Sequence, residues 1–344
     1  MIRHPLLLAV FAADLVAFLL VLGASVTAFR IALNWRPEDP SEAQLRLERR
    51  AETAALAVGW ATGLTLLATA ALVYALTNLL PDVVPGAMCG TGVLQSMQGA
   101  GPRMLTYRLL AVALLWLWWR VAQVNRSLPE GPLVALGARL VLLALPLMGL
   151  ALHASWQAAL AMDLQQAVDC CAVIYDHFRS PDEARRTLGA GRAFWLPVFA
   201  AASIAAAAAA WAAWRHPRRP RRHWLLAALV LVWLPVAAIA LTRFLSAYHY
   251  GVLHHHCPWC LFLPVHHLVG FPLWGAWLLT ALETPPVLVL SLIAARGSPA
   301  VAAAAAARAG GAARNILSAQ LLFSALAVGP ALWWRLTFGV WLAG

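Results

Sequence analysis

The sequence contains no lysine, and only 14 of its 344 residues are Asp or Glu. Charged residues occupy 11% of the 344 positions, whereas a soluble domain carries about a quarter. So few charges cannot cover the surface of a soluble protein of this length. Hydrophobic residues make up 62% of the chain, and the mean hydropathy is +0.74. The composition therefore excludes a water-soluble fold and indicates a protein whose solvent is the lipid bilayer.

Several functional motifs are also absent. The sequence has no Walker loop and no dinucleotide-binding fingerprint. Cys257-Pro258-Trp259-Cys260 is followed by Leu261 rather than His, which excludes the attachment motif of c-type haem. The net charge of +11 comes from arginines that flank apolar runs, which is typical of membrane topology signals. We therefore expect no nucleic-acid partner.

Long apolar runs predict an all-α, polytopic integral membrane bundle of about eight transmembrane helices, because a span needs about 20 apolar residues. The expected bundle forms a single membrane domain over residues 1–344. The first run exceeds the length of a signal-peptide core, so we expect it to be retained. Residues 283–286 (Glu-Thr-Pro-Pro) interrupt the seventh run, which is either one kinked helix or two shorter pieces. The expected spans are 6–31, 54–80, 104–123, 134–161, 193–214, 224–247, 267–295 and 316–342.

The distribution of arginine predicts the orientation. The short loop 216–222 is intensely basic, which places it in the cytoplasm. Alternating outward from this loop places sixteen of the 25 arginines inside and both termini outside, in what we expect to be a bacterial inner membrane. The expected cytoplasmic loops are 34–53, 124–133, 215–223 and 296–315, and the expected outer loops are 81–103, 162–192 and 248–266.

All five cysteines fall on the outer face in this topology, which in a bacterium is an oxidising compartment. Cys257 and Cys260 form a Cys-x-x-Cys pair, whose sulfurs are close enough to form a disulfide or to bind one ion. Pro258 suits the first position of a helix, and Cys257 would then lie at a helix N-terminus, which lowers a thiol pKa. The pair is therefore a candidate for redox chemistry, with an inert structural disulfide as the alternative.

Histidines surround this pair and suggest a second kind of chemistry. Thiolates and imidazoles together suit copper or zinc, so the same stretch could form a metal site or handle haem. The candidate ligands beside Cys257 and Cys260 are His254, His255, His256, His266 and His267.

The remaining cysteines lie in other outer loops. Cys170 and Cys171 are adjacent, and a disulfide between neighbours is strained, so each is expected to pair elsewhere, exchange or bind a metal. Cys89 precedes Gly90-Thr91-Gly92, which indicates a tight turn or a close backbone approach, and it is a plausible partner for Cys170 or Cys171.

Four charged residues near the membrane complete the candidate site. Asp14 lies inside the first span, where a carboxylate is costly, and it could relay protons or pair with an arginine. Arg108, Arg243 and Arg335 lie near outer helix ends and could hold a quinone headgroup, although a side chain that snorkels to the interface is the simpler interpretation of each.

We therefore expect a membrane thiol–disulfide redox protein that couples Cys257 and Cys260 to the loop cysteines, to a quinone and to an extracytoplasmic protein partner. This cysteine arrangement resembles that of bacterial disulfide-bond oxidases and vitamin K epoxide reductases, which pair a membrane-end Cys-x-x-Cys with loop cysteines. The chain departs from them in its larger number of spans, its vicinal pair and its odd cysteine count. The alternatives are a copper, zinc or haem-handling protein, and a transporter or assembly subunit with structural disulfides.

Overall fold

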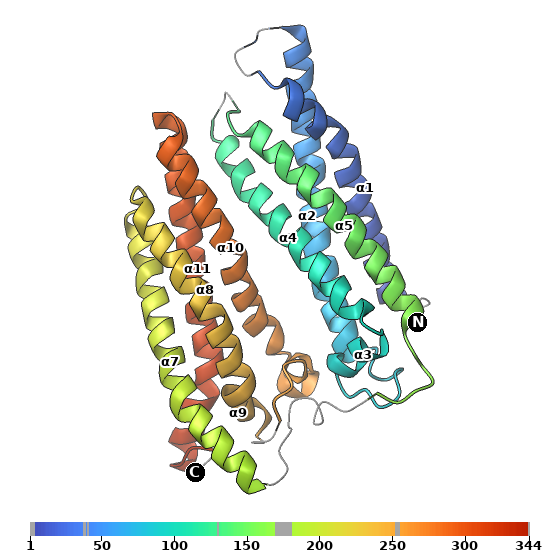
Figure 1. The fold of residues 1–344 in the computed structure, drawn as a ribbon, viewed down its shortest axis with the longest axis vertical. Helices are drawn as coiled ribbons and strands as arrows, with labels where there is room; N and C mark the ends of the chain where they lie inside the picture. The colour runs from blue at the N-terminus through green and yellow to red at the C-terminus, as the bar shows by residue number, and fades with distance from the viewer. Residues whose placement is uncertain are drawn as a thin grey trace. The chain divides into compact units, whose positions relative to one another are not determined.

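A computed structural model describes residues 4–36, 39, 41–128, 131–168, 181–251 and 255–342. The chain is 83% helical, and no strand occurs in the part that the structure describes. Within these described ranges, eight helices are long and apolar enough to cross a membrane, which confirms the predicted all-α, multi-pass membrane fold. The chain divides into two compact units, each described by itself below (Figure 1).

Unit 1 comprises residues 1–79, 93–166 and 293–308. Its helix α1 packs against α2 and α5, and α5 also packs against α4. Small buried residues allow this close approach, because alanine recurs along the packed faces of α1, α4 and α5. The long helices of this unit are α1 (Pro5–Asn34), α2 (Glu42–Asn78), α4 (Ala100–Asn125) and α5 (Val134–Ala161).

Local capping explains where two of these helices begin. His4 Nδ1 accepts a hydrogen bond from the Leu6 amide at 3.2 Å before α1, and Pro5 occupies the first turn, where its missing N–H costs nothing. Ser41 Oγ accepts from the Gln44 amide at 3.3 Å before α2.

A buried ion pair joins α1 to α4 within unit 1. The Asp14 carboxylate accepts two hydrogen bonds from the Arg108 guanidinium, one of them from Nη1 at 2.9 Å. The exposed fractions of the two side chains are 11% for Asp14 and 2% for Arg108. Of the two roles expected for Asp14, the structure shows the pairing with an arginine.

Unit 2 comprises residues 80–92, 167–292 and 309–344. Aromatic side chains fill its core, where the Phe323 ring lies 5.3 Å from Trp233 and 6.2 Å from Phe199 in edge-to-face contacts. The elements are α7 (Pro181–Arg215), α8 (Pro220–Ala240), the π-helical turn η1 (Leu241–Leu245), α9 (Ser246–Tyr250), α10 (Gly270–Arg296) and α11 (Pro299–Phe338). The last turn of α10 and the first turns of α11 belong to unit 1.

Some helix bounds differ from the expected spans. The seventh span is one continuous helix, α10, which runs through Pro285 and Pro286. Helix α11 begins at Pro299 rather than near residue 316, so most of the loop expected at 296–315 is helical. An alanine run occupies this stretch, and alanine has the highest helix propensity of all residues. Helix α7 likewise begins at Pro181, inside the outer loop expected at 162–192.

Candidate functional site

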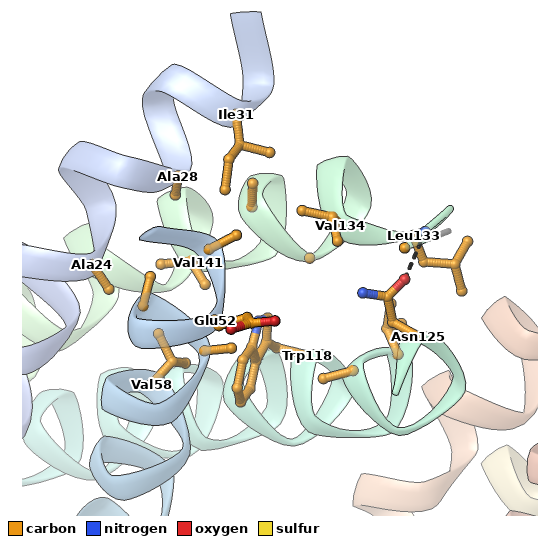
Figure 2. Close-up of a pocket in the computed structure, with 18 of the residues that line it drawn as sticks. Ala24, Ala28, Ile31, Glu52, Val58, Trp118, Asn125, Leu133, Val134 and Val141 are labelled. Atoms are coloured by element: carbon orange, nitrogen blue, oxygen red, sulfur yellow. Dashed lines mark hydrogen bonds between the residues drawn. The ribbon is translucent and has the colours of Figure 1, made fainter. Parts of the chain in front are cut away.

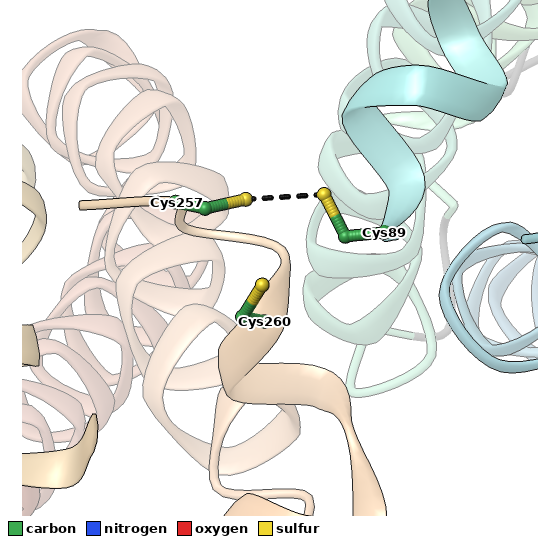
Figure 3. Close-up of side chains that lie close together, drawn as sticks. All are labelled: Cys89, Cys257 and Cys260. Carbon is green, nitrogen blue, oxygen red and sulfur yellow. Dashed lines mark hydrogen bonds between the residues drawn. The ribbon is translucent and has the colours of Figure 1, made fainter. Parts of the chain in front are cut away.

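Three cysteines from distant parts of the sequence meet in unit 2. Cys89 directly precedes the short helix α3 (Gly90–Ser96), and Cys257 and Cys260 lie in the loop between α9 and α10. All three side chains are buried, and their sulfur atoms lie within 4.8 Å of one another (Figure 3). The sequence shows that Cys257 and Cys260 are close together, whereas only the fold brings Cys89 next to them.

The cysteines differ in oxidation state. Cys89 takes part in a disulfide, whereas Cys257 and Cys260 carry free thiols. Cys257 Sγ lies 3.2 Å from Cys89 Sγ, and because Cys89 has no thiol hydrogen, Cys257 is the donor of this contact. A free thiol thus rests directly against a disulfide sulfur, in the arrangement from which thiol–disulfide exchange begins.

Trp259 fixes the approach of the two loops. Its indole ring packs on the backbone of Gly90, where a Cβ atom would lie 2.7 Å from Trp259 Cε3. The segment of Cys89 therefore fits against the Cys-x-x-Cys loop only because residue 90 has no side chain. This contact explains the glycine next to Cys89 as the close backbone approach that the sequence indicated.

The Cys-x-x-Cys loop is held by a tyrosine and by its own backbone. The Tyr250 hydroxyl donates a hydrogen bond to the Cys257 carbonyl at 2.5 Å. The expected α-helix does not begin at Pro258: residues 258 and 259 form a turn, and Cys260–Phe262 form one 3-10 turn. Two prolines and one glycine (Pro258, Pro264 and Gly270) limit regular backbone hydrogen bonding in this stretch, so only short turns form.

The pKa of the Cys257 thiol is lowered to about 7. The largest cause is a hydrogen bond from the Cys260 side chain, which overcomes the opposite effect of burial. Hydrogen bonds that the Trp259 amide, the Thr91 hydroxyl and the Cys260 amide donate to the sulfur lower the pKa further. The Thr91 oxygen lies 3.8 Å from Cys257 Sγ. The lowered pKa increases the fraction of nucleophilic thiolate near neutral pH relative to an ordinary cysteine.

Two of the candidate histidines pack around Tyr250 rather than around the sulfurs. The ring centroids of His255 and His266 lie 4.7 Å and 4.8 Å from that of Tyr250. Burial lowers the pKa of His266, and the charges of His255 and His267 lower it further. The thiolate is thus stabilised by sulfur, amide and hydroxyl groups, whereas the sequence pointed to a helix N-terminus.

Among the described residues, the potential metal ligands that cluster are the three sulfurs of Cys89, Cys257 and Cys260. No described imidazole shares that cluster, although His256 is buried next to Cys257 in the chain. The sulfur of Cys89 is part of a disulfide, so while that disulfide is intact only Cys257 and Cys260 can act as thiolate ligands. A three-thiolate set would require reduction of that disulfide.

The three arginines predicted at the site lie on α4, η1 and α11. Arg108 is paired with Asp14 in unit 1. Arg243 lies exposed in η1, and the exposed Arg335 near the end of α11 lies 5.8 Å from the Trp341 ring centroid. Their expected role at a quinone headgroup stays a prediction. Cys170, Cys171 and His254 lie outside the described residues.

Sequence reasoning missed Thr91, Tyr250 and Trp259. Trp259 lies inside the Cys-x-x-Cys motif and Thr91 lies two residues after Cys89, but nothing in either pattern shows that one loop packs on the other. Tyr250 is one of only five tyrosines, and its place beside the histidine run was the available signal.

Comparisons with known proteins identify no relative. No family model, no curated protein and no solved structure matches this chain.

Proposed function

We propose that this membrane protein catalyses thiol–disulfide exchange through Cys257, Cys260 and the disulfide of Cys89. The observation that supports the proposal is the 3.2 Å approach of the free Cys257 sulfur to the disulfide-bonded Cys89 sulfur. The lowered pKa of Cys257 adds to this support, because the thiolate is the attacking species in exchange.

The first step is attack by the Cys257 thiolate on Cys89 Sγ. A Cys257–Cys89 disulfide forms, the original bond of Cys89 breaks, and the former partner of Cys89 leaves as a thiolate that takes up a proton. The sequence contains five cysteines, of which Cys257 and Cys260 are free, so we propose Cys170 or Cys171 as this partner.

The second step assigns Cys260 as the resolving residue. Its thiol loses a proton and attacks Cys257 Sγ, which forms the Cys257–Cys260 disulfide and releases Cys89 as a thiolate. Two electrons have then moved from the Cys-x-x-Cys pair to the loop pair. Every bond exchange is reversible, so the same geometry passes a disulfide in the opposite direction when the outside reactants favour it.

The proposed outside reactants are a membrane quinone and an extracytoplasmic dithiol protein. A quinone takes two electrons and two protons from the Cys257 and Cys260 thiols and leaves their disulfide. Exchange then oxidises the pair that contains Cys89, which passes its disulfide to the protein partner. A quinone suits the setting because the eight membrane-spanning helices place the chain in the lipid in which quinones dissolve.

The test is to trap the intermediate in intact membranes with a maleimide polymer, followed by peptide mapping. Cys260→Ser is expected to accumulate the Cys89–Cys257 disulfide, because the resolving thiol is missing. Cys257→Ser, the matched control, is expected to keep the original disulfide of Cys89. If Cys260→Ser accumulates no Cys89–Cys257 bond, and addition of a quinone leaves every thiol of the parent protein unchanged, exchange is excluded and a structural disulfide remains.

A metal site is the second candidate, and the sulfur atoms within 4.8 Å of one another are the observation that favours it. After reduction of the Cys89 disulfide, three thiolates would suit Cu(I) or Zn(II). The same labelling experiment distinguishes the two functions. Thiols that resist maleimide until a chelator is added indicate a bound metal, whereas thiols that respond to quinone and ignore the chelator indicate exchange.

A further inference from the structure

Unit 1 contains a cavity of about 700 Å³, and no cysteine is among the residues that line it (Figure 2). Residues of α1, α2, α4 and α5 line it, at the end of the unit that includes the C-terminus of α1 and the N-terminus of α2. The arginine distribution predicts that this end faces the cytoplasm. The volume is that of a ligand pocket rather than of a packing defect.

The cavity has an apolar wall and a polar rim. Ala24 and Ala28 of α1, Val58 of α2 and Val141 of α5 form part of the wall, and all four are buried. The rim carries polar groups of different kinds, and Figure 2 shows the Glu52 and Asn125 side chains turned toward the space between the helices. An occupant must therefore have an apolar part and a polar head.

The rim carries charges of both signs. Glu48 and Glu52 contribute two carboxylates, and Arg126 contributes a guanidinium that lies 5.0 Å from the Trp119 ring centroid. The Glu48 carboxylate already accepts a hydrogen bond from Gln44 at 3.0 Å, whereas Glu52 is exposed at the cavity. A polar headgroup that carries both a cation and an anion matches the charges of this rim. A purely anionic headgroup would be repelled by the two carboxylates.

Trp35 adds a requirement for an acceptor. Its indole Nε1 is buried at the rim and has no hydrogen-bond partner among the described residues. A buried donor without an acceptor is unfavourable, so an oxygen of the occupant is expected to satisfy it. A phosphate or ester oxygen supplies that acceptor.

We propose that this cavity binds one phospholipid with an ethanolamine headgroup. An acyl chain lies along the alanine and valine wall, the phosphate or ester oxygens face Trp35 and Arg126, and the ammonium faces Glu52. A primary ammonium suits carboxylates better than choline does, because it donates three hydrogen bonds and a quaternary ammonium donates none.

The test is native mass spectrometry of the delipidated full-length protein with phosphatidylethanolamine, phosphatidylcholine and phosphatidylglycerol of identical acyl chains. We expect one phosphatidylethanolamine per chain, bound more tightly than the other two lipids. Equal binding of the ethanolamine and choline lipids, or a preference for phosphatidylglycerol, overturns the proposal.

Variants locate the site. Glu52→Gln is expected to weaken phosphatidylethanolamine binding about five- to tenfold, the effect of losing one charge-assisted hydrogen bond, and to leave phosphatidylcholine binding unchanged. Ala55→Phe fills the cavity and is expected to abolish binding, whereas Ala57→Phe, on the same helix but outside the cavity lining, is the matched control. Unchanged binding in both Glu52→Gln and Ala55→Phe places the lipid elsewhere and refutes the site.

Discussion

The indole ring of Trp259 lies directly on the backbone of Gly90, with ring atoms where a Cβ of residue 90 would stand. Each residue is the neighbour or near neighbour of a reactive cysteine: Gly90 follows Cys89, and Trp259 separates Cys257 from Cys260 in the motif. We therefore expect this contact to set the distance between the two sulfurs. A larger side chain at residue 90 therefore tests directly whether the short distance between the Cys89 and Cys257 sulfurs affects their reaction.

Gly90→Ala is expected to separate Cys257 from Cys89 and to slow formation of the Cys89–Cys257 disulfide. A methyl group 2.7 Å from Trp259 Cε3 forces the indole ring or the backbone to move, at a cost of about 1–3 kcal/mol. The measurement is the rate of disulfide formation in the Cys260→Ser background. Gly275→Ala is the control, because a Cβ there meets nothing within 4 Å. Equal rates in the two variants would show that the Trp259 contact does not set the sulfur distance.

The reactivity of Cys257 is expected to follow a pKa of about 7. Alkylation by iodoacetamide, mapped to Cys257 by mass spectrometry, should be fast above pH 7 and decline as the pH falls through 7, because protonation removes the thiolate. Cys260→Ala removes the largest cause of the low pKa and should move the midpoint upward, toward the ordinary value of about 8.5. Cys260→Ser keeps a hydroxyl donor and should lie between the two. A midpoint that is the same in all three proteins would contradict this assignment.

Tyr250→Phe is expected to slow exchange and to leave the pKa of Cys257 near 7. The substitution removes the hydroxyl that donates to the Cys257 carbonyl, a loss worth about 1 kcal/mol, and leaves the groups around the sulfur in place. Rates of Cys89–Cys257 disulfide formation and the alkylation profile measure the two effects separately. Tyr248→Phe, nearby on α9, is the control. A changed alkylation midpoint in Tyr250→Phe would show that the hydroxyl acts on the thiol itself.

Removing one member of the Asp14–Arg108 pair is expected to destabilise unit 1 by about 3–5 kcal/mol, because the remaining charge is left buried. Asp14→Leu and Arg108→Met should each lower the thermal unfolding midpoint of the protein in detergent. The double variant should recover most of the loss, since neither charge remains. If Asp14→Leu instead leaves stability intact and lowers activity, the carboxylate is functional, as the proton-relay interpretation requires.

The sequence by itself determined the solvent, the fold class and the approximate positions of the spans. A chain with few charges and long apolar runs is stable only in the lipid bilayer. In the bilayer, helices form because they satisfy their own backbone hydrogen bonds. Because these signals are local and additive, the eight spans were recognisable without tertiary information. The helix ends were less so: the start of α11 at Pro299 depends on the helix propensity of the alanine run, which outweighs Gly310 and Gly311 further along the helix. The Cys-x-x-Cys pair was visible for the same local reason, since both sulfurs lie within four residues.

The tertiary structure decided which distant groups meet. Cys89 and Cys257 are 168 residues apart, and no periodicity or spacing encodes that their sulfurs lie 3.2 Å from each other. The pairing of Asp14 with Arg108, the contact of Trp259 with Gly90 and the donation from Tyr250 to Cys257 arise in the same way, from the packing of helices and the loops between them. A pKa near 7 for Cys257 also needs the fold, because part of its cause is the Thr91 hydroxyl from helix α3. Local sequence patterns showed the candidate groups, and long-range packing set the distances between them.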